Sequence, residues 1–136
     1  MGISTVVLLV ILGFAPSLIW LGFYIKKDLH PEPKYLISKT FLMGIVMAPL
    51  AIIAQWIFRG IVLSAAPDYN IQISIPFFLW AAFVEEVVKF LVVKFVVLHD
   101  SEFDEPLDAM IYMVSAGLGF AAVENILILF QAIPNG

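Results

Sequence analysis

The sequence IPFFLWAAFVEEVVKFLVVKFVVL occupies residues 75–98 and sets the expected architecture. It is long enough to cross a bilayer as a helix, yet Glu85 and Glu86 lie near its middle. A charged side chain at the centre of a membrane costs at least about 2.5–3.5 kcal/mol, so carboxylates at this depth indicate a functional site. A second apolar run places Glu124 at a similar depth. We therefore expect carboxylates from two neighbouring helices to form one intramembrane site.

The composition identifies the chain as an integral membrane protein. Of its 136 residues, 62% are hydrophobic and 13% are charged, and the mean hydropathy is +1.04. The sequence contains no cysteine, which excludes disulfides and thiolate metal ligands. The formal net charge is −4, with no basic arm and no glycine-rich phosphate loop, so no nucleic-acid partner is expected. The expected surroundings are a lipid bilayer.

Four apolar runs predict an all-α, polytopic membrane helical bundle with about four transmembrane helices. The predicted spans cover residues 3–25, 36–62, 75–98 and 107–133, within a single integral membrane domain over residues 1–136. The first run lacks a charged segment before it and is too long for a cleaved signal peptide, so it is expected to be retained. Basic residues near the span ends favour a cytoplasmic location for the first and third connections.

Spacing within the third span indicates acid–base chemistry. Glu85 and Lys89 are four residues apart, so their side chains meet on one helical face. Glu86 points about 100° away around the helix but lies three residues before Lys89. Two carboxylates this close in a low-dielectric environment favour different protonation states, with one as proton acceptor and the other as ligand or orienter. This is the chemistry expected of a glutamate-based hydrolase.

The fourth span carries the third carboxylate and its candidate support. Counted from the shared membrane face, Glu85 lies about 13 residues and Glu124 about 16 residues deep, which places them within about 5 Å of each other in depth. Asn125 adds a neutral donor and acceptor beside Glu124. Asp108 lies at the helix start, where an acidic residue also serves as a cap. The small residues of Gly117–Gly119 favour close approach of another helix.

Two short motifs at this spacing resemble those of a known family. Residues 85–89, EEVVK, are similar to the E-E-x-x-K motif of the PrsW-type intramembrane proteases, which resemble the CAAX prenyl endopeptidase and bacteriocin-processing superfamily. Residues 120–124, FAAVE, resemble the F-x-x-x-E motif of that family. The resemblance implies an integral membrane endopeptidase of bacterial or archaeal cell membranes. Its substrates would be peptides or membrane proteins such as anti-sigma factors.

The resemblance also implies roles for individual residues. Glu85 would be the water-activating base, Glu86 its partner, and Glu124 a metal ligand or second polarising group, with Lys89 setting their charge. Asn125 and Asp108 are candidate supporting residues. Zinc is the candidate cofactor, with Glu86 and Glu124 as candidate ligands. Three carboxylates without a local histidine are nevertheless a poor zinc site.

Other readings of the same carboxylates stay open. Later helices of the family supply histidine, whereas His30 and His99 lie in predicted loops, so we expect this chain to be the N-terminal part of a larger family domain. One alternative is a non-catalytic membrane scaffold or binding protein that keeps the carboxylate site. Another is an ion-coupled or proton-coupled carrier, for which internal inverted symmetry would be expected, and none is visible in the sequence.

Overall fold

The chain folds into four long helices. The computed structural model describes residues 2–27, 32–71, 74–101, 103 and 106–132. The helices are α1 (Ile3–Lys27), α2 (Lys34–Ala65), α3 (Ile75–Val96) and α4 (Pro106–Ala132). The all-α prediction is confirmed, and each helix lies within a few residues of a predicted span. His30 lies outside the described residues.

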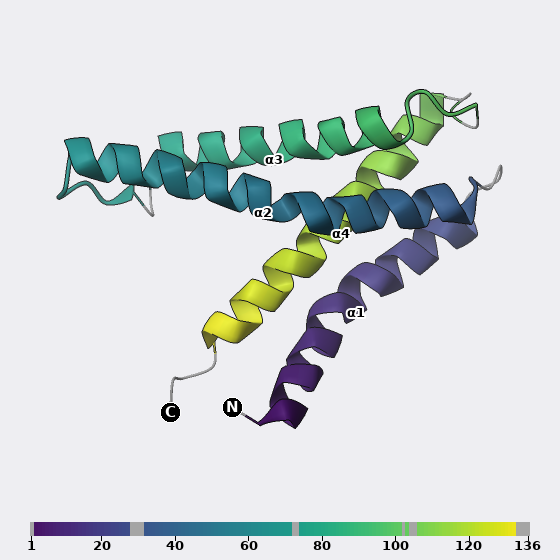
Figure 1. Cartoon of the computed structure of the whole chain (residues 1–136), viewed down its shortest axis with the longest axis horizontal. Helices are drawn as coiled ribbons and strands as arrows, with labels where there is room; N and C mark the ends of the chain where they lie inside the picture. Colours follow the sequence, from purple (N-terminus) through teal and green to yellow (C-terminus); the bar gives the residue numbers. More distant parts are fainter. Residues whose placement is uncertain (1, 28–31, 72–73, 102, 104–105, 133–136) are drawn as a thin grey trace.

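The helices are arranged as two antiparallel pairs that cross each other. Figure 1 shows α2 and α3 running side by side, while α1 and α4 run obliquely to them. Helix α4 packs against each of the other three helices and so forms the centre of the fold. One end of the bundle contains the end of α1, the start of α2, the end of α3 and the start of α4 (Figure 1). The described helix ends that flank the first and third connections therefore lie at the same end of the bundle, and their predicted cytoplasmic location stays a prediction.

Composition separates α3 from the other three helices. Helices α1, α2 and α4 are each long and apolar enough to cross a membrane. With 22 residues, α3 is about 33 Å long, close to the roughly 30 Å of a hydrocarbon core. Helix α3 differs from the other three helices because it carries the charged residues Glu85, Glu86, Lys89 and Lys94. Its passage through a bilayer therefore depends on polar partners for these side chains.

Local signals fix both ends of α3. The Ser74 side chain caps the helix by accepting a hydrogen bond of 3.3 Å from the backbone N–H of Phe77. Pro76 occupies the first turn, where its missing N–H costs no intrahelical bond. Lys94 in the last turn places positive charge near the negative end of the helix dipole. These ends fix the register that brings Glu85 to the middle of the helix.

Glycines allow α2 and α4 to cross at close range. A methyl group added at Gly119 would clash with the backbone oxygen of Phe41, and one added at Gly44 would clash with the backbone oxygen of Ala116. Gly117, in contrast, has no such neighbour within 4 Å. Close backbone approach through small residues is a common way for membrane helices to associate. The predicted close approach is thus made at Gly119.

A buried polar contact ties the first connection to α4. The Tyr112 hydroxyl in α4 donates a hydrogen bond to Oε2 of Glu32, and both side chains are buried. Tyr112 belongs to a buried apolar cluster that also contains Leu36 of α2 and Val97, the residue just after α3. A carboxylate taken from water needs such a partner. This contact helps to hold the start of α2 against α4.

Candidate functional site

Three helices meet at the carboxyl group of Glu85. From α2, Nε2 of Gln55 donates a hydrogen bond of 3.1 Å to Oε1 of Glu85. From α3 itself, Nζ of Lys89 lies 3.7 Å from Oε2. From α4, Glu124 is close enough to Glu85 and Lys89 for their charges to interact, and its neighbours Phe120 and Val123 belong to the same apolar cluster as Val84 and Val88 of α3. We call Gln55, Glu85, Lys89 and Glu124 the glutamate centre.

Lys89 connects the two sequence motifs. Its Nζ lies 2.9 Å from Oε1 of Glu86 and 3.7 Å from Oε2 of Glu85. It also lies over the ring of Phe120 in α4, 5.5 Å from the ring centroid. A cation over an aromatic face is attracted by the ring quadrupole, and the attraction grows when water is excluded. The lysine of the first motif and the phenylalanine of the second therefore belong to one contact.

The structure separates the two adjacent glutamates. Glu85 faces α2 and α4, whereas the Glu86 side chain is 65% exposed and is paired with Lys89. Consecutive helical residues point about 100° apart, so the two cannot face the same neighbours. Of the three predicted carboxylates, Glu85 and Glu124 are brought together, as the depth count predicted. Glu86 lies on the outer face of α3.

The other predicted residues lie away from the glutamate centre. Nδ2 of Asn125 donates a long hydrogen bond of 3.4 Å to the backbone oxygen of Gly13 in α1. Asp108 is buried in the first turn of α4, and the 16 residues between it and Glu124 correspond to about 24 Å along the helix. His99 is exposed in the turn after α3. The supporting roles of Asn125 and Asp108 stay predictions.

The contact between Asn125 and Gly13 leads to a prediction. Asn125→Ala is expected to lower the free energy of unfolding by about 0.6 kcal/mol, the average for a hydrogen bond between membrane helices. This free energy is measured on the purified protein by unfolding in detergent. An unchanged free energy of unfolding would contradict a stabilising contact between Asn125 and Gly13.

Gln55 was missed by the sequence reasoning, although a signal for it existed. It lies in an otherwise apolar part of α2, next to Ile52, Ile53 and Ala54. Polar side chains in membrane helices usually hydrogen-bond across to another helix. A lone glutamine in a predicted span therefore indicates an interhelical contact, but the sequence could not identify its partner.

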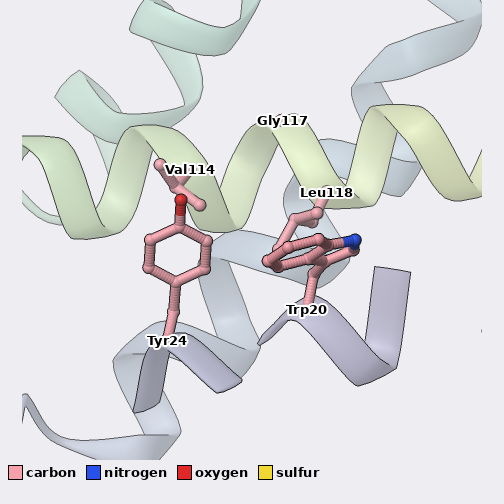
Figure 2. A pocket seen from close by; sticks show the side chains of 5 residues that line it. All are labelled: Trp20, Tyr24, Val114, Gly117 and Leu118. Carbon is pink, nitrogen blue, oxygen red and sulfur yellow. The ribbon is translucent and has the colours of Figure 1, made fainter. Parts of the chain in front are cut away.

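The structure also contains an apolar hollow away from the carboxylates. It measures about 350 Å³ and lies between α1 and α4, lined by Trp20, Tyr24, Val114, Gly117 and Leu118. Figure 2 shows the Tyr24 hydroxyl directed toward Val114 and the Trp20 ring lying against Leu118. None of the glutamates belongs to this lining. The hollow and the glutamate centre are therefore separate features of α4.

The fold defines a polytopic helical membrane protein in which two carboxylates, from α3 and α4, are brought together. Within this class, a sequence model described as "PrsW family intramembrane metalloprotease" matches residues 32–136. The chain belongs to the PrsW family. The matched region contains α2, α3 and α4, and therefore all four residues of the glutamate centre.

Several bacterial relatives agree with this assignment. Protease PrsW of Geobacillus kaustophilus is 39% identical over 127 residues, covering 91% of this chain and 52% of that protein. Protease PrsW of Oceanobacillus iheyensis is 36% identical, covering 91% and 54%, and that of Bacillus subtilis is 30% identical, covering 86% and 51%. The chain spans about half the length of the curated relatives it matches. No solved structure matches it.

Proposed function

We propose that this chain carries the glutamate half of an intramembrane endopeptidase site that hydrolyses a peptide bond of a membrane protein. The observation that carries the proposal is the meeting of Glu85 and Glu124 from two helices, together with Lys89. Paired carboxylates held in different environments divide acid and base roles between them. Membership of the PrsW family supports the same reaction class.

The proposed chemistry uses the residues of the glutamate centre directly. Glu85 as carboxylate accepts a proton from water as the water oxygen attacks the carbonyl carbon of the substrate. The carbon–nitrogen bond then breaks, and the proton held by the carboxyl pair is delivered to the leaving amine. Lys89 offsets the negative charge of the two glutamates during these steps. Its contact with Phe120 holds the ammonium group beside them.

A metal ion is implied by the family description but does not fit the described residues alone. Among residues 2–27, 32–71, 74–101, 103 and 106–132, no group of three or more His, Asp or Glu side chains is placed to hold one. Catalytic zinc sites use three protein ligands, whereas here only Glu85 and Glu124 converge. Glu86, expected as a ligand together with Glu124, pairs with Lys89 instead. No step of the proposed chemistry therefore passes through a metal.

The proposed substrate is a membrane-anchored protein, with anti-sigma factors as the class that the family resemblance suggests. Glu85 lies at the middle of α3, and Glu124 lies in the C-terminal half of α4, a helix long and apolar enough to cross a membrane, so the scissile bond has to reach them within or near the bilayer. Soluble peptides that cannot enter the bilayer are expected to be poor substrates. The test below therefore uses a membrane-anchored reporter.

The experiment compares two proteins in liposomes that contain a membrane-anchored reporter. One is this chain, and the other is a chimera in which it replaces the matching half of the Geobacillus kaustophilus relative. We expect the chimera to cleave the reporter, and Glu124→Gln in the chimera to reduce the rate about 10²-fold or more, because the carboxyl pair is lost. The rate is measured by the appearance of the released reporter fragment.

The outcomes separate the protease from the alternative functions. Cleavage that is lost in the Glu124→Gln variant would support the proposal, and cleavage by the chain alone would show that its own residues suffice. A chimera that folds and inserts but cleaves no reporter would overturn it and favour the non-catalytic scaffold. Cleavage that is unaffected by Glu124→Gln would place the catalytic groups elsewhere.

A further inference from the structure

Gln55 provides the contact between α2 and the glutamate centre. Its side chain is half-buried, and its Nε2 donates to Oε1 of Glu85 across the α2–α3 interface. Its neighbour Trp56, in contrast, is 70% exposed and points away from the bundle. An amide group in a membrane interior needs a polar partner, and Glu85 supplies it.

The two oxygens of Glu85 have different surroundings. Oε1 accepts the hydrogen bond from Gln55 at 3.1 Å. Oε2 lies 3.7 Å from Nζ of Lys89, which is beyond hydrogen-bond length. A hydrogen bond from a neutral amide to a carboxylate is charge-assisted and directional. The bond therefore restricts rotation of the carboxyl group, while Lys89 makes a looser contact at Oε2 and Glu124 approaches the same carboxyl group from α4.

We propose that Gln55 is a positioning residue that fixes the Glu85 carboxylate by binding Oε1, so that Oε2 is the oxygen that accepts the proton of the attacking water. The inference rests on the proposed protease function. An amide suits this role because it donates a hydrogen bond but does not titrate, so it does not compete with Glu85 or Glu124 for the proton. Fixing a base in its reactive orientation raises the rate of the chemical step rather than the binding of substrate.

The first measurement tests the bond without using activity. Infrared spectra of the chain in lipid, minus the spectrum of Glu85→Gln, identify the carboxylate stretching band of Glu85. Gln55→Met keeps the length of the side chain but removes the donor, and it is expected to shift that band. Trp56→Leu, a change at the exposed neighbouring position, is the matched control and is expected to leave the band in place. An unshifted band in Gln55→Met would overturn the proposal.

The second measurement tests the effect on catalysis in the chimera described above. Gln55→Met is expected to lower kcat about 10-fold while KM changes less than about twofold, as is typical when a supporting hydrogen bond is lost. Adding Gln55→Met to Glu85→Gln is expected to cause no further loss, because the base that Gln55 orients is already absent. Gln55→Asn retains a donor on a shorter side chain and is expected to recover part of the lost kcat.

The combined results distinguish the possible failures. A shifted band with unchanged kcat would overturn the positioning role and leave Gln55 as a contact between helices. An equal loss of kcat in Trp56→Leu would show a general packing effect and would also overturn the positioning role. A shifted band in the chain, together with an unsubstituted chimera that cleaves nothing, would overturn the protease function itself, and the catalytic part of this proposal with it.

Discussion

Glu85→Gln is expected to reduce the rate of reporter cleavage by about 10²–10⁴-fold, the range for loss of a general base. The substitution keeps the size of the side chain and a hydrogen-bonding partner for Gln55, so the helices should remain packed. It removes the group that we propose accepts the proton from water. The measurement is the kcat of the chimera in liposomes. Circular dichroism of the same preparation confirms that the helix content is retained.

Two further variants on the same helix make this result specific. Lys94→Gln also removes a charge from α3, but Lys94 lies over the Phe95 ring rather than in the glutamate centre, and it should retain nearly full activity. Glu86→Gln is expected to cause a smaller loss than Glu85→Gln, because Glu86 is mostly exposed and contacts Lys89. Equal losses in the Glu85 and Glu86 variants would contradict the separation of the two glutamates.

Gly119→Ala is expected to destabilise the bundle by about 1–3 kcal/mol, the usual cost of overpacking. The added methyl group would clash with the backbone oxygen of Phe41, and backbone atoms at a helix crossing have little freedom to move. Because α4 packs against every other helix, a shift at this crossing also displaces Glu124 relative to Glu85. Reporter cleavage by the chimera should therefore fall together with the stability of the bundle.

Gly117→Ala is the matched control for this prediction. It makes the same chemical change two residues away, where an added methyl group has no neighbour within 4 Å. Replacing glycine by alanine inside a helix generally stabilises it by about 0.5–1 kcal/mol, so this variant should be as stable as the unsubstituted protein or slightly more so. Unfolding in a denaturing detergent, followed by circular dichroism, measures both variants. Equal destabilisation by both would show that helical glycine itself, rather than the crossing, is required.

The helices were predictable because their determinants are local. Long apolar runs, the serine at position 74 followed by Pro76, and polar connections each act over a few residues. The depth of Glu85 and Glu124 was also predictable, because helical rise converts residue number directly into height. Neither inference required knowledge of which helices are neighbours beyond the pair joined by the third connection.

The composition of the glutamate centre was only partly predictable. The sequence reasoning placed Glu86 beside Glu85 in the site, whereas helix geometry turns it toward the outer face and Lys89. It gave Asn125 a supporting role, whereas its hydrogen bond is made to Gly13 in α1. Gln55 was not predicted at all, because its partner is 30 residues away in the sequence. Each of these outcomes depends on which face of a helix meets which neighbour.

The sequence alone determined that this is a helical membrane protein, that Glu85 and Glu124 lie at similar depths, and that its two motifs resemble those of the PrsW family. These properties follow from hydrophobicity and helical rise, which act within each segment. The tertiary structure decided that α4 lies at the centre, that Glu85 rather than Glu86 meets Glu124, and that Gln55 and Phe120 complete their surroundings. Those choices depend on how each helix is rotated, which is set by packing between segments, including the close α2–α4 crossing at Gly44 and Gly119.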